Sequence, residues 1–277
     1  INRLEATLSR TIDTSDVSRL NAGEAVVVQP ETRALLERAL TLSDETGGTF
    51  DMTVAPLVAL WGITSDAPRV PSQEEIDALL PLVGGEHVHM DDAVTLDTGC
   101  AVDLGGIAKG YASQQVADIL RAHGVTSAVV SLGGNVYVCG SKPDGTPWNV
   151  GIQDPAGSGY AAMVSLTDRF AVTSGGYQRY FEAEDGTVYR HILDPRTGRP
   201  ADSDLLSVTI ISDDGTAADA YSTALYVMGE QEAVSFWRAH GGFELILITA
   251  DGRLLYTPEL ADTITAPEGC AYDFQPI

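Results

Sequence analysis

Basic residues are scarce in this chain of 277 residues. It contains 16 Lys and Arg against 39 Asp and Glu, a formal net charge of −23 at pH 7. General binding to nucleic acid or to an anionic membrane surface needs a positive field, so the composition excludes both. A phosphate ligand could bind only where local geometry and a bridging cation overcome the repulsion of the whole chain.

Cysteine and long apolar runs are also lacking. The three cysteines, Cys100, Cys139 and Cys270, form no C-x-x-C pair, which argues against a disulfide framework and against a cysteine-based zinc site. No stretch approaches the ~20 apolar residues of a membrane-spanning helix. Ile1 already lies within a helical pattern, so we expect a further N-terminal segment in the natural protein.

Helical and β-like patterns are mixed along the chain. Helices are expected over residues 1–10, 30–43, 72–80, 108–124, 217–228 and 233–240. Ser72 and Glu75 have the spacing of a capping box. Short β-like runs fill the second half, and a closing hairpin is expected to turn at Asp251-Gly252. Without a repeat or a linker, the pattern favours one α+β domain over residues 1–277.

The segment DLGGIAKGYA, residues 103–112, predicts a glycine turn at the start of a helix. Free N–H groups at such a start favour anions, and the carbonyls of Gly105 and Gly106 could bind a hard metal ion. The spacing matches neither the Walker A nor the dinucleotide-binding pattern, and Asp103 as an ordinary cap remains the alternative. Two further glycine turns follow expected strands at 132–135 and 173–176.

The helix expected after residue 213 carries oxygen-bearing side chains on one face. Asp219, Ser222 and Thr223 stand at i, i+3 and i+4, and residues at this spacing are neighbours on a helix. Carboxylate and hydroxyl oxygens suit Mg²⁺ in the company of substrate phosphates. The alternative is structural, because Thr216 and Asp219 also have capping-box spacing.

Two histidine patterns are candidates for chemistry. His191 ends an expected strand just before an Asp194-Pro195 turn and could act as a general base near neutral pH; the alternative is a hydrogen-bonded histidine at a strand edge. His87 and His89 form an H-x-H pattern, which occurs in metal-binding sites, but the sequence offers no third ligand nearby. That pair is interpreted as part of an edge strand.

Six segments occur in an order that resembles the ApbE family of FAD:protein FMN transferases: FDMTVAPLVALWG, VDLGGIAKGYA, SLGGNVYV, TSGGYQRYF, HILDPRTGRP and DAYSTALYVMG. The resemblance covers nearly the whole chain. It implies an α+β domain with a T-fold-type antiparallel sheet core and packed helices. The implied activity is Mg²⁺-dependent transfer of FMN from FAD to a Ser or Thr hydroxyl of an acceptor protein, forming a phosphoester and releasing AMP. The resemblance also implies an acceptor that is a subunit of a redox complex, and an extracytoplasmic location, periplasmic or as a membrane-anchored lipoprotein.

The resemblance further assigns residues. Its metal ligands fall on the Gly106 carbonyl, Asp219 and Thr223, and its catalytic histidine falls on His191. Its flavin contacts fall on Thr49, Phe50, Asp51, Asp103, Lys109 and Leu193.

This sequence departs from the family pattern at two positions. Many members have a second aspartate where Ser222 stands, and a tyrosine where Thr11 stands. The family's first strand is expected upstream of Ile1. One alternative, an FAD pyrophosphatase that releases FMN and AMP, shares all of these motifs. A second alternative is a non-catalytic FAD-binding protein, and the intact Asp103, Asp219, Thr223 and His191 argue against it.

Overall fold

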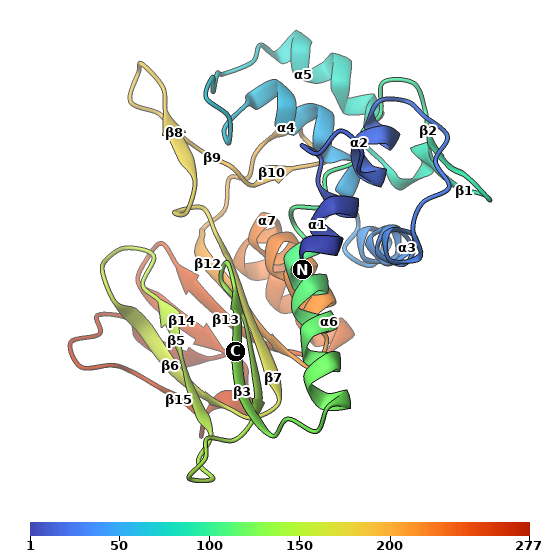
Figure 1. The fold of residues 1–277 in the computed structure, drawn as a ribbon. Coiled ribbons are helices and arrows are strands. Elements are labelled where there is room, and N and C mark those ends of the chain that lie inside the picture. Colours follow the sequence, from blue (N-terminus) through green and yellow to red (C-terminus); the bar gives the residue numbers. More distant parts are fainter. The chain divides into compact units, whose positions relative to one another are not determined.

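The computed structural model describes residues 1–277. Contacts between Cα atoms divide the chain into two compact units, one of residues 1–108 with 178–201 and one of residues 109–177 with 202–277. Each unit therefore combines segments that are far apart in sequence. The α+β class is confirmed (Figure 1), while the expectation of a single domain stays a prediction. None of the helices combines the length and apolarity needed to cross a membrane.

The first unit is mainly helical, with short two-stranded sheets (Figure 1). Its helices are α1 (Asn2–Leu8), α2 (Asp16–Asn21), α3 (Pro30–Glu45), α4 (Ala55–Trp61) and α5 (Gln73–Leu79), and its antiparallel strand pairs are β1 (Val88–Met90) with β2 (Val94–Leu96), β8 (Tyr180–Glu182) with β9 (Val188–Arg190), and β10 (Leu193–Asp194) with β11 (Arg199–Pro200).

Local sequence signals explain where these helices begin. Pro30 stands in the first turn of α3, where its missing N–H has no partner to lose. The capping box before α5 is complete, because the Ser72 hydroxyl accepts from the Glu75 N–H and the Glu75 carboxylate accepts from the Ser72 N–H. The expected helices over 30–43 and 72–80 are thus confirmed within two residues at their ends.

A small core joins the two chain segments of this unit. Leu57, Trp61, Ile76 and Leu193 are buried together. The indole Nε1 of Trp61 donates to the carbonyl of Gly198 at 2.8 Å. This core and the indole hydrogen bond hold residues 178–201 against α4 and α5.

The second unit is built on a seven-stranded sheet in the order β16-β14-β13-β12-β7-β4-β3. Its strands are β3 (Ser127–Leu132), β4 (Asn135–Gly140), β7 (Arg169–Gly175), β12 (Leu205–Ser212), β13 (Glu244–Thr249), β14 (Arg253–Tyr256) and β16 (Asp273–Pro276). A three-stranded sheet contains β15 (Ile264–Thr265), β6 (Tyr160–Leu166) and β5 (Trp148–Gln153). All neighbouring strands are antiparallel except β14 and β16, so the expected antiparallel core carries one parallel edge pair.

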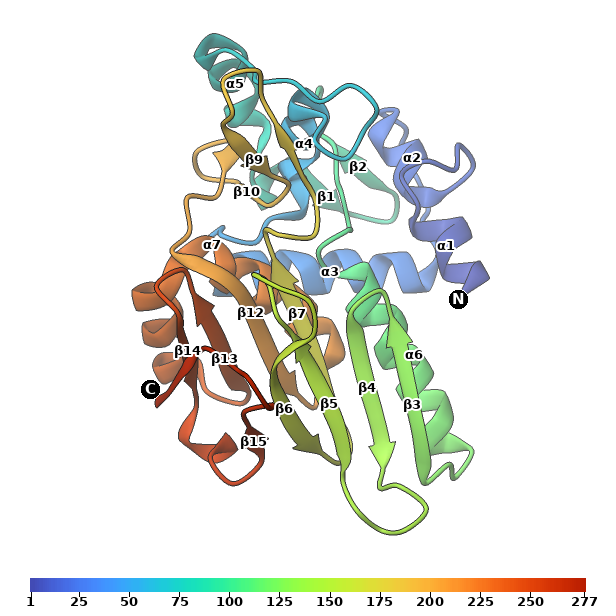
Figure 2. The same ribbon diagram turned by 90° about the vertical axis from the view of Figure 1, so that its left-hand side faces the viewer.

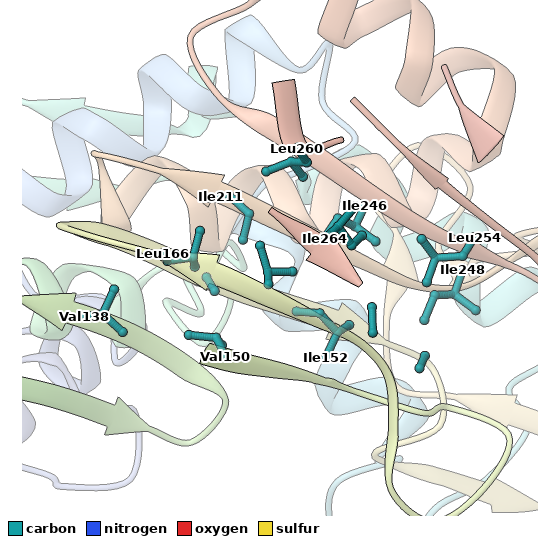
Figure 3. Packing of buried hydrophobic residues seen from close by; sticks show 14 residues of the cluster. Val138, Val150, Ile152, Leu166, Ile211, Ile246, Ile248, Leu254, Leu260 and Ile264 are labelled. Atoms are coloured by element: carbon teal, nitrogen blue, oxygen red, sulfur yellow. The ribbon is translucent and has the colours of Figure 1, made fainter. Parts of the chain in front are cut away.

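The three-stranded sheet covers one face of the large sheet, and the helices α6 (Ala108–Ala122) and α7 (Gly215–His240) cover the other (Figure 2). The cluster between the sheets includes Val138, Ile211, Ile246 and Ile248 from the large sheet (Figure 3). Side chains alternate between the faces of a strand, so the neighbouring buried Leu247 points toward the helical layer. Central strands buried on both faces explain the continuous apolar run in β13.

The helix α7 bears out one expectation and corrects another. Gly229 (φ 76°, ψ 177°) is not helical and kinks α7, and the two parts on either side of it correspond to the helices expected over 217–228 and 233–240. The Asp204 carboxylate accepts from the Glu230 N–H at 2.9 Å, which satisfies a donor that the kink releases. Asp219 does not cap the helix. Asp214 does, by accepting from two backbone N–H groups of the first turn.

Candidate functional site

Asp219 is a buried carboxylate on the second turn of α7, with 3% of its surface exposed. Its Oδ2 accepts from the backbone N–H of Gly110 at 2.8 Å, and its Oδ1 lies 3.9 Å from Nζ of Lys109. Both partners belong to the first turn of α6. The glycine-turn segment and the 213–229 segment, two separate motifs in the sequence, therefore meet in the second unit.

The close contact of α6 and α7 depends on glycine at position 110. A Cβ there would lie 2.2 Å from the carbonyl oxygen of Gly215 and 2.6 Å from the Cβ of Asp219, far inside normal contact. Glycine is thus required for space, which lets the backbone N–H reach the carboxylate.

The charge of Asp219 is only partly compensated by the protein. Burial raises the pKa of this carboxyl group, while the Lys109 ammonium, the Gly110 N–H and the neighbouring Asn135 amide oppose the rise. The Nδ2 of Asn135, on the first residue of β4, is buried and neighbours the Asp219 carboxyl group, but it does not reach hydrogen-bond geometry with it or with any other group. A buried carboxylate beside an unsatisfied amide is the environment in which a bound cation or ligand adds most.

Hydroxyl groups complete an oxygen-rich cluster around Asp219. The Ser174 hydroxyl, on β7, lies 2.8 Å from that of Ser222 and 3.2 Å from that of Thr223. Ser222 also donates to the Asp219 carbonyl at 2.9 Å. The helical face expected from the sequence therefore exists, and β7 adds Ser174 to it.

The donor set of this cluster fits Mg²⁺ better than a softer metal. Mg²⁺ binds carboxylate and neutral oxygens and is usually held by one or two carboxylates together with substrate phosphates. The chain has no group of three or more His, Cys, Asp and Glu side chains that could hold a metal ion, so Asp219 has no carboxylate-rich cage around it. The Gly106 carbonyl, which belongs to the other unit, stays a prediction as a ligand.

In the first unit, Asp103 lies beside Met52, the residue that follows the segment 49–51. Its backbone N–H donates to the carbonyl of Met52 at 2.7 Å. One carboxylate oxygen accepts from the Gly105 N–H at 2.8 Å, and the other lies 3.5 Å from Nε of Arg10. Asp103 therefore caps the glycine turn, as the structural alternative expected, and an ion pair holds it in place.

The residues Thr49, Phe50 and Asp51 are buried. The Asp51 carboxylate accepts from the Ser43 hydroxyl at 3.0 Å and from the Thr53 N–H at 2.7 Å. Because these side chains serve the local structure, a ligand contact here would come mainly from the backbone. Their assignment as flavin contacts stays a prediction.

His191 is held at its Nδ1 by a backbone carbonyl. Both Nδ1 and the backbone N–H of His191 lie 3.1 Å from the carbonyl oxygen of Arg179. A carbonyl accepts only, so Nδ1 carries the hydrogen and Nε2 is the basic nitrogen of the neutral ring. Leu193, two residues on, is buried in the Trp61 core, so its side chain serves packing.

His87 and His89 contact one carboxylate. The Asp97 oxygens lie 3.0 Å from Nδ1 of His87 and 2.8 Å from Nε2 of His89, and the hydrogen bond to Asp97 raises the pKa of His87. His89 lies in the β1–β2 hairpin and His87 immediately precedes β1. This agrees with the expected edge strand. The three side chains form a hydrogen-bonded clasp.

Sequence reasoning missed two members of the Asp219 cluster, Asn135 and Ser174. Both belong to the glycine turns noted at 132–135 and 173–176, so a signal was present. Nothing in the sequence indicated that these turns approach α7, because that proximity follows from strand order.

Comparison with known proteins gives one consistent result. A model of the ApbE family matches residues 1–247. A curated relative from Treponema pallidum, named FAD:protein FMN transferase, is 36% identical over 95% of this chain and 79% of its own length. An ApbE protein crystal structure from Thermotoga maritima matches with a TM-score of 0.86 at 37% identity, covering 93% of this chain and 86% of that one. The apo form of a Pseudomonas stutzeri flavinyl transferase matches with a TM-score of 0.81 at 34% identity, covering 96% and 83%. The expected recognition and the expected transferase class are thereby confirmed.

Proposed function

Because the chain belongs to the ApbE family, we propose that it transfers FMN from FAD to a hydroxyl group of an acceptor protein. The observation that carries this proposal is the buried Asp219, whose carboxylate contacts Gly110 and Lys109. The Ser222 and Thr223 hydroxyls follow one turn along α7 and donate to the Asp219 carbonyl. A protein that only binds flavin does not need a buried carboxylate whose negative charge is only partly neutralised by a neighbouring lysine.

The reaction exchanges a phosphoanhydride bond for a phosphoester bond. The oxygen of an acceptor Ser or Thr bonds to the phosphorus of the FMN moiety, the pyrophosphate bond breaks, and AMP leaves with the bridging oxygen. When bound, Mg²⁺ supplies charge neutralisation on the pyrophosphate oxygens. Asp219, Thr223 and the Gly106 carbonyl are the proposed ligands, which fits the oxygen donors around Asp219.

Lys109 and His191 have separate proposed roles. The Lys109 ammonium, next to Asp219, supplies positive charge to phosphate oxygens in a chain whose net charge of −23 repels them. The basic Nε2 of His191 takes the proton of the attacking hydroxyl. The proposed flavin contacts are Thr49, Phe50, Asp51, Asp103, Lys109 and Leu193.

The acceptor and the location are proposed from the family alone. The acceptor would be a subunit of a redox complex, and the chain would act outside the cytoplasm, in the periplasm or as a lipid-anchored protein. Fractionation of the source cells tests the location, and recovery in the cytoplasm would contradict it.

One assay separates the candidate activities. The chain is incubated with FAD, Mg²⁺ and flavin-free candidate acceptor proteins, and in-gel flavin fluorescence is measured beside free FMN and AMP. Fluorescence on an acceptor with one AMP per label is the expected result. FMN and AMP without labelled protein would assign an FAD pyrophosphatase, and intact FAD would assign a binding protein.

Asp219→Asn tests the metal assignment with almost no change of shape. The amide cannot replace the carboxylate charge, so we expect a loss of Mg²⁺-dependent transfer on the order of a hundredfold or more. Asp118→Asn is the control, since Asp118 is an exposed residue on the same helix as Lys109. Transfer by Asp219→Asn at the rate of the unmodified chain would show that Asp219 does not hold the metal.

A further inference from the structure

The strand β3 is an open edge of the seven-stranded sheet. It is the last strand in the sheet order and pairs only with β4 (Figure 2). Its sequence, SAVVSL, contains no charge and no proline. Folded proteins usually blunt exposed edges with charges, proline or short length. The opposite edge, β16, follows that rule with Asp273 and Pro276 over four residues.

The hydrogen-bonding groups of this edge can be assigned from the hairpin register. Leu132 pairs with Asn135 across the two-residue turn Gly133-Gly134. The residues flanking such a turn form a hydrogen-bonded pair, and every second pair along an antiparallel ladder does the same. The remaining residues, Ser127, Val129 and Ser131, therefore aim their N–H and C=O groups away from β4.

The side chains of β3 leave room for another strand. Ser127, Val129 and Ser131 are exposed, with Val129 at 49%. β-Branched residues and the hydroxyls of Ser and Thr interact favourably across neighbouring strands. An added strand made of small, uncharged and β-branched residues would fit this surface, whereas an acidic segment would be repelled by the net charge of −23.

The C-terminal end of the β3 edge lies next to the Asp219 cluster. At its C-terminal end, Gly133 approaches Lys109, so that a Cβ on the glycine would lie 3.5 Å from Cδ of the lysine. Asn135, the other residue flanking the turn, neighbours the Asp219 carboxylate. A chain in β conformation advances roughly 3.3 Å per residue. A strand paired with Ser127–Ser131 would therefore bring its next two or three residues to Lys109.

We propose that the edge of β3 binds an extended segment of the acceptor protein as an additional strand and so delivers its Ser or Thr hydroxyl to the Lys109–Asp219 cluster. This inference rests on the proposed function and adds to it the mode of acceptor recognition. Main-chain hydrogen bonds to Ser127, Val129 and Ser131 supply affinity for any extended segment. The turn at Gly133-Gly134, which has no side chains, lets that segment pass close to Lys109.

Val129→Pro tests the edge without altering the cluster. Proline removes the outward N–H and is tolerated where that N–H faces solvent, so the β3–β4 pairing is kept. Val129→Thr is the matched control, because it retains both the N–H and the β-branched shape. The probe is the acceptor protein that becomes labelled in the transfer assay, or a synthetic peptide of its labelled segment.

We expect Val129→Pro to raise the KM for the acceptor by about tenfold, the effect of losing one or two hydrogen bonds, with the affinity for FAD unchanged. Val129→Thr should stay within about twofold. In the unmodified chain, a saturating amount of the peptide should slow hydrogen exchange at the amides of Ser127, Val129 and Ser131. If the proline variant does not fold, the hydrogen-exchange measurement on the unmodified chain tests the proposal instead.

Two results would overturn the proposal while leaving the transferase function intact. One is an unchanged acceptor KM in a folded Val129→Pro variant, and the other is unprotected β3 amides in the presence of the peptide. A dimer that Val129→Pro dissociates without changing the KM would assign the edge to a second copy of the chain. If no acceptor is labelled at all, the proposed function fails first and the edge proposal falls with it.

Discussion

Replacing Gly110 by alanine sets two opposing effects against each other. Alanine stabilises a helix interior by about 1 kcal/mol relative to glycine, and this is the upper limit for Gly110, which lies in the first turn of α6. Its Cβ, however, would lie 2.2 Å from the Gly215 carbonyl oxygen, whereas carbon and oxygen atoms normally approach to roughly 3.4 Å. One helix must therefore move by about 1.2 Å relative to the other.

That movement breaks the contact on which Asp219 depends. The Gly110 N–H lies 2.8 Å from Oδ2 of Asp219, and a shift of about 1 Å takes it beyond hydrogen-bond range. Losing a hydrogen bond to a charged group costs about 1.5–3 kcal/mol, and overpacking adds about 1–3 kcal/mol. The steric effect therefore outweighs helix propensity, and we expect Gly110→Ala to lower the free energy of unfolding by about 2–4 kcal/mol.

Urea denaturation followed by circular dichroism measures this change, and titration with Mg²⁺ in the presence of FAD should show weakened binding. Ala112→Gly, two residues along the same helix, calibrates the propensity effect at about 1 kcal/mol of destabilisation. A Gly110→Ala variant that is about 1 kcal/mol more stable than the unmodified chain would refute the reasoning, because propensity alone would then govern the site.

Two further predictions concern the first unit. Trp61→Phe should lower the free energy of unfolding by about 2–4 kcal/mol in urea denaturation, because it leaves the Gly198 carbonyl without its 2.8 Å donor and opens a cavity in the core; an unchanged stability would show that this hydrogen bond is unimportant. The contact between His87 and Asp97 raises the pKa of His87 and lowers the pKa of Asp97. The clasp therefore stabilises the fold most between about pH 4 and 6.5. This stabilisation is lost as the pH rises through the folded-state pKa of His87, and also as the pH falls through the folded-state pKa of Asp97. Asp97→Asn should therefore differ most from the unmodified chain in that window, and Asp91→Asn, in the same hairpin, should not; a difference between the Asp97 variant and the unmodified chain that does not vary with pH would contradict the assignment.

Elements with local signals were predictable from the sequence. The capping box at Ser72 and Glu75, the proline at the start of α3 and the Asp251-Gly252 hairpin all formed as expected. Each depends on residues within one or two turns of each other, so their energetics are contained in a short stretch of chain. The order of the glycine-rich motifs likewise sufficed to indicate the family.

The groups that surround Asp219 could be identified only from the tertiary structure. Gly110 and Asp219 are separated by 109 positions in the chain, and their contact follows from two helices packing on the same face of a sheet. The kink at Gly229 depends on Asp204, 26 residues from the amide that it accepts from. Asn135 and Ser174 join the cluster because β4 and β7 are neighbours in the sheet.

The sequence by itself thus determined the α+β class, the family and the oxygen-rich face of one helix. It could not determine which backbone and hydroxyl groups surround that face, or which strand forms an open edge of the sheet. Helix caps and turns are decided by interactions between neighbours in sequence. Strand order and helix packing are decided by the burial of apolar surface across the whole unit, and that information is not contained in any single segment.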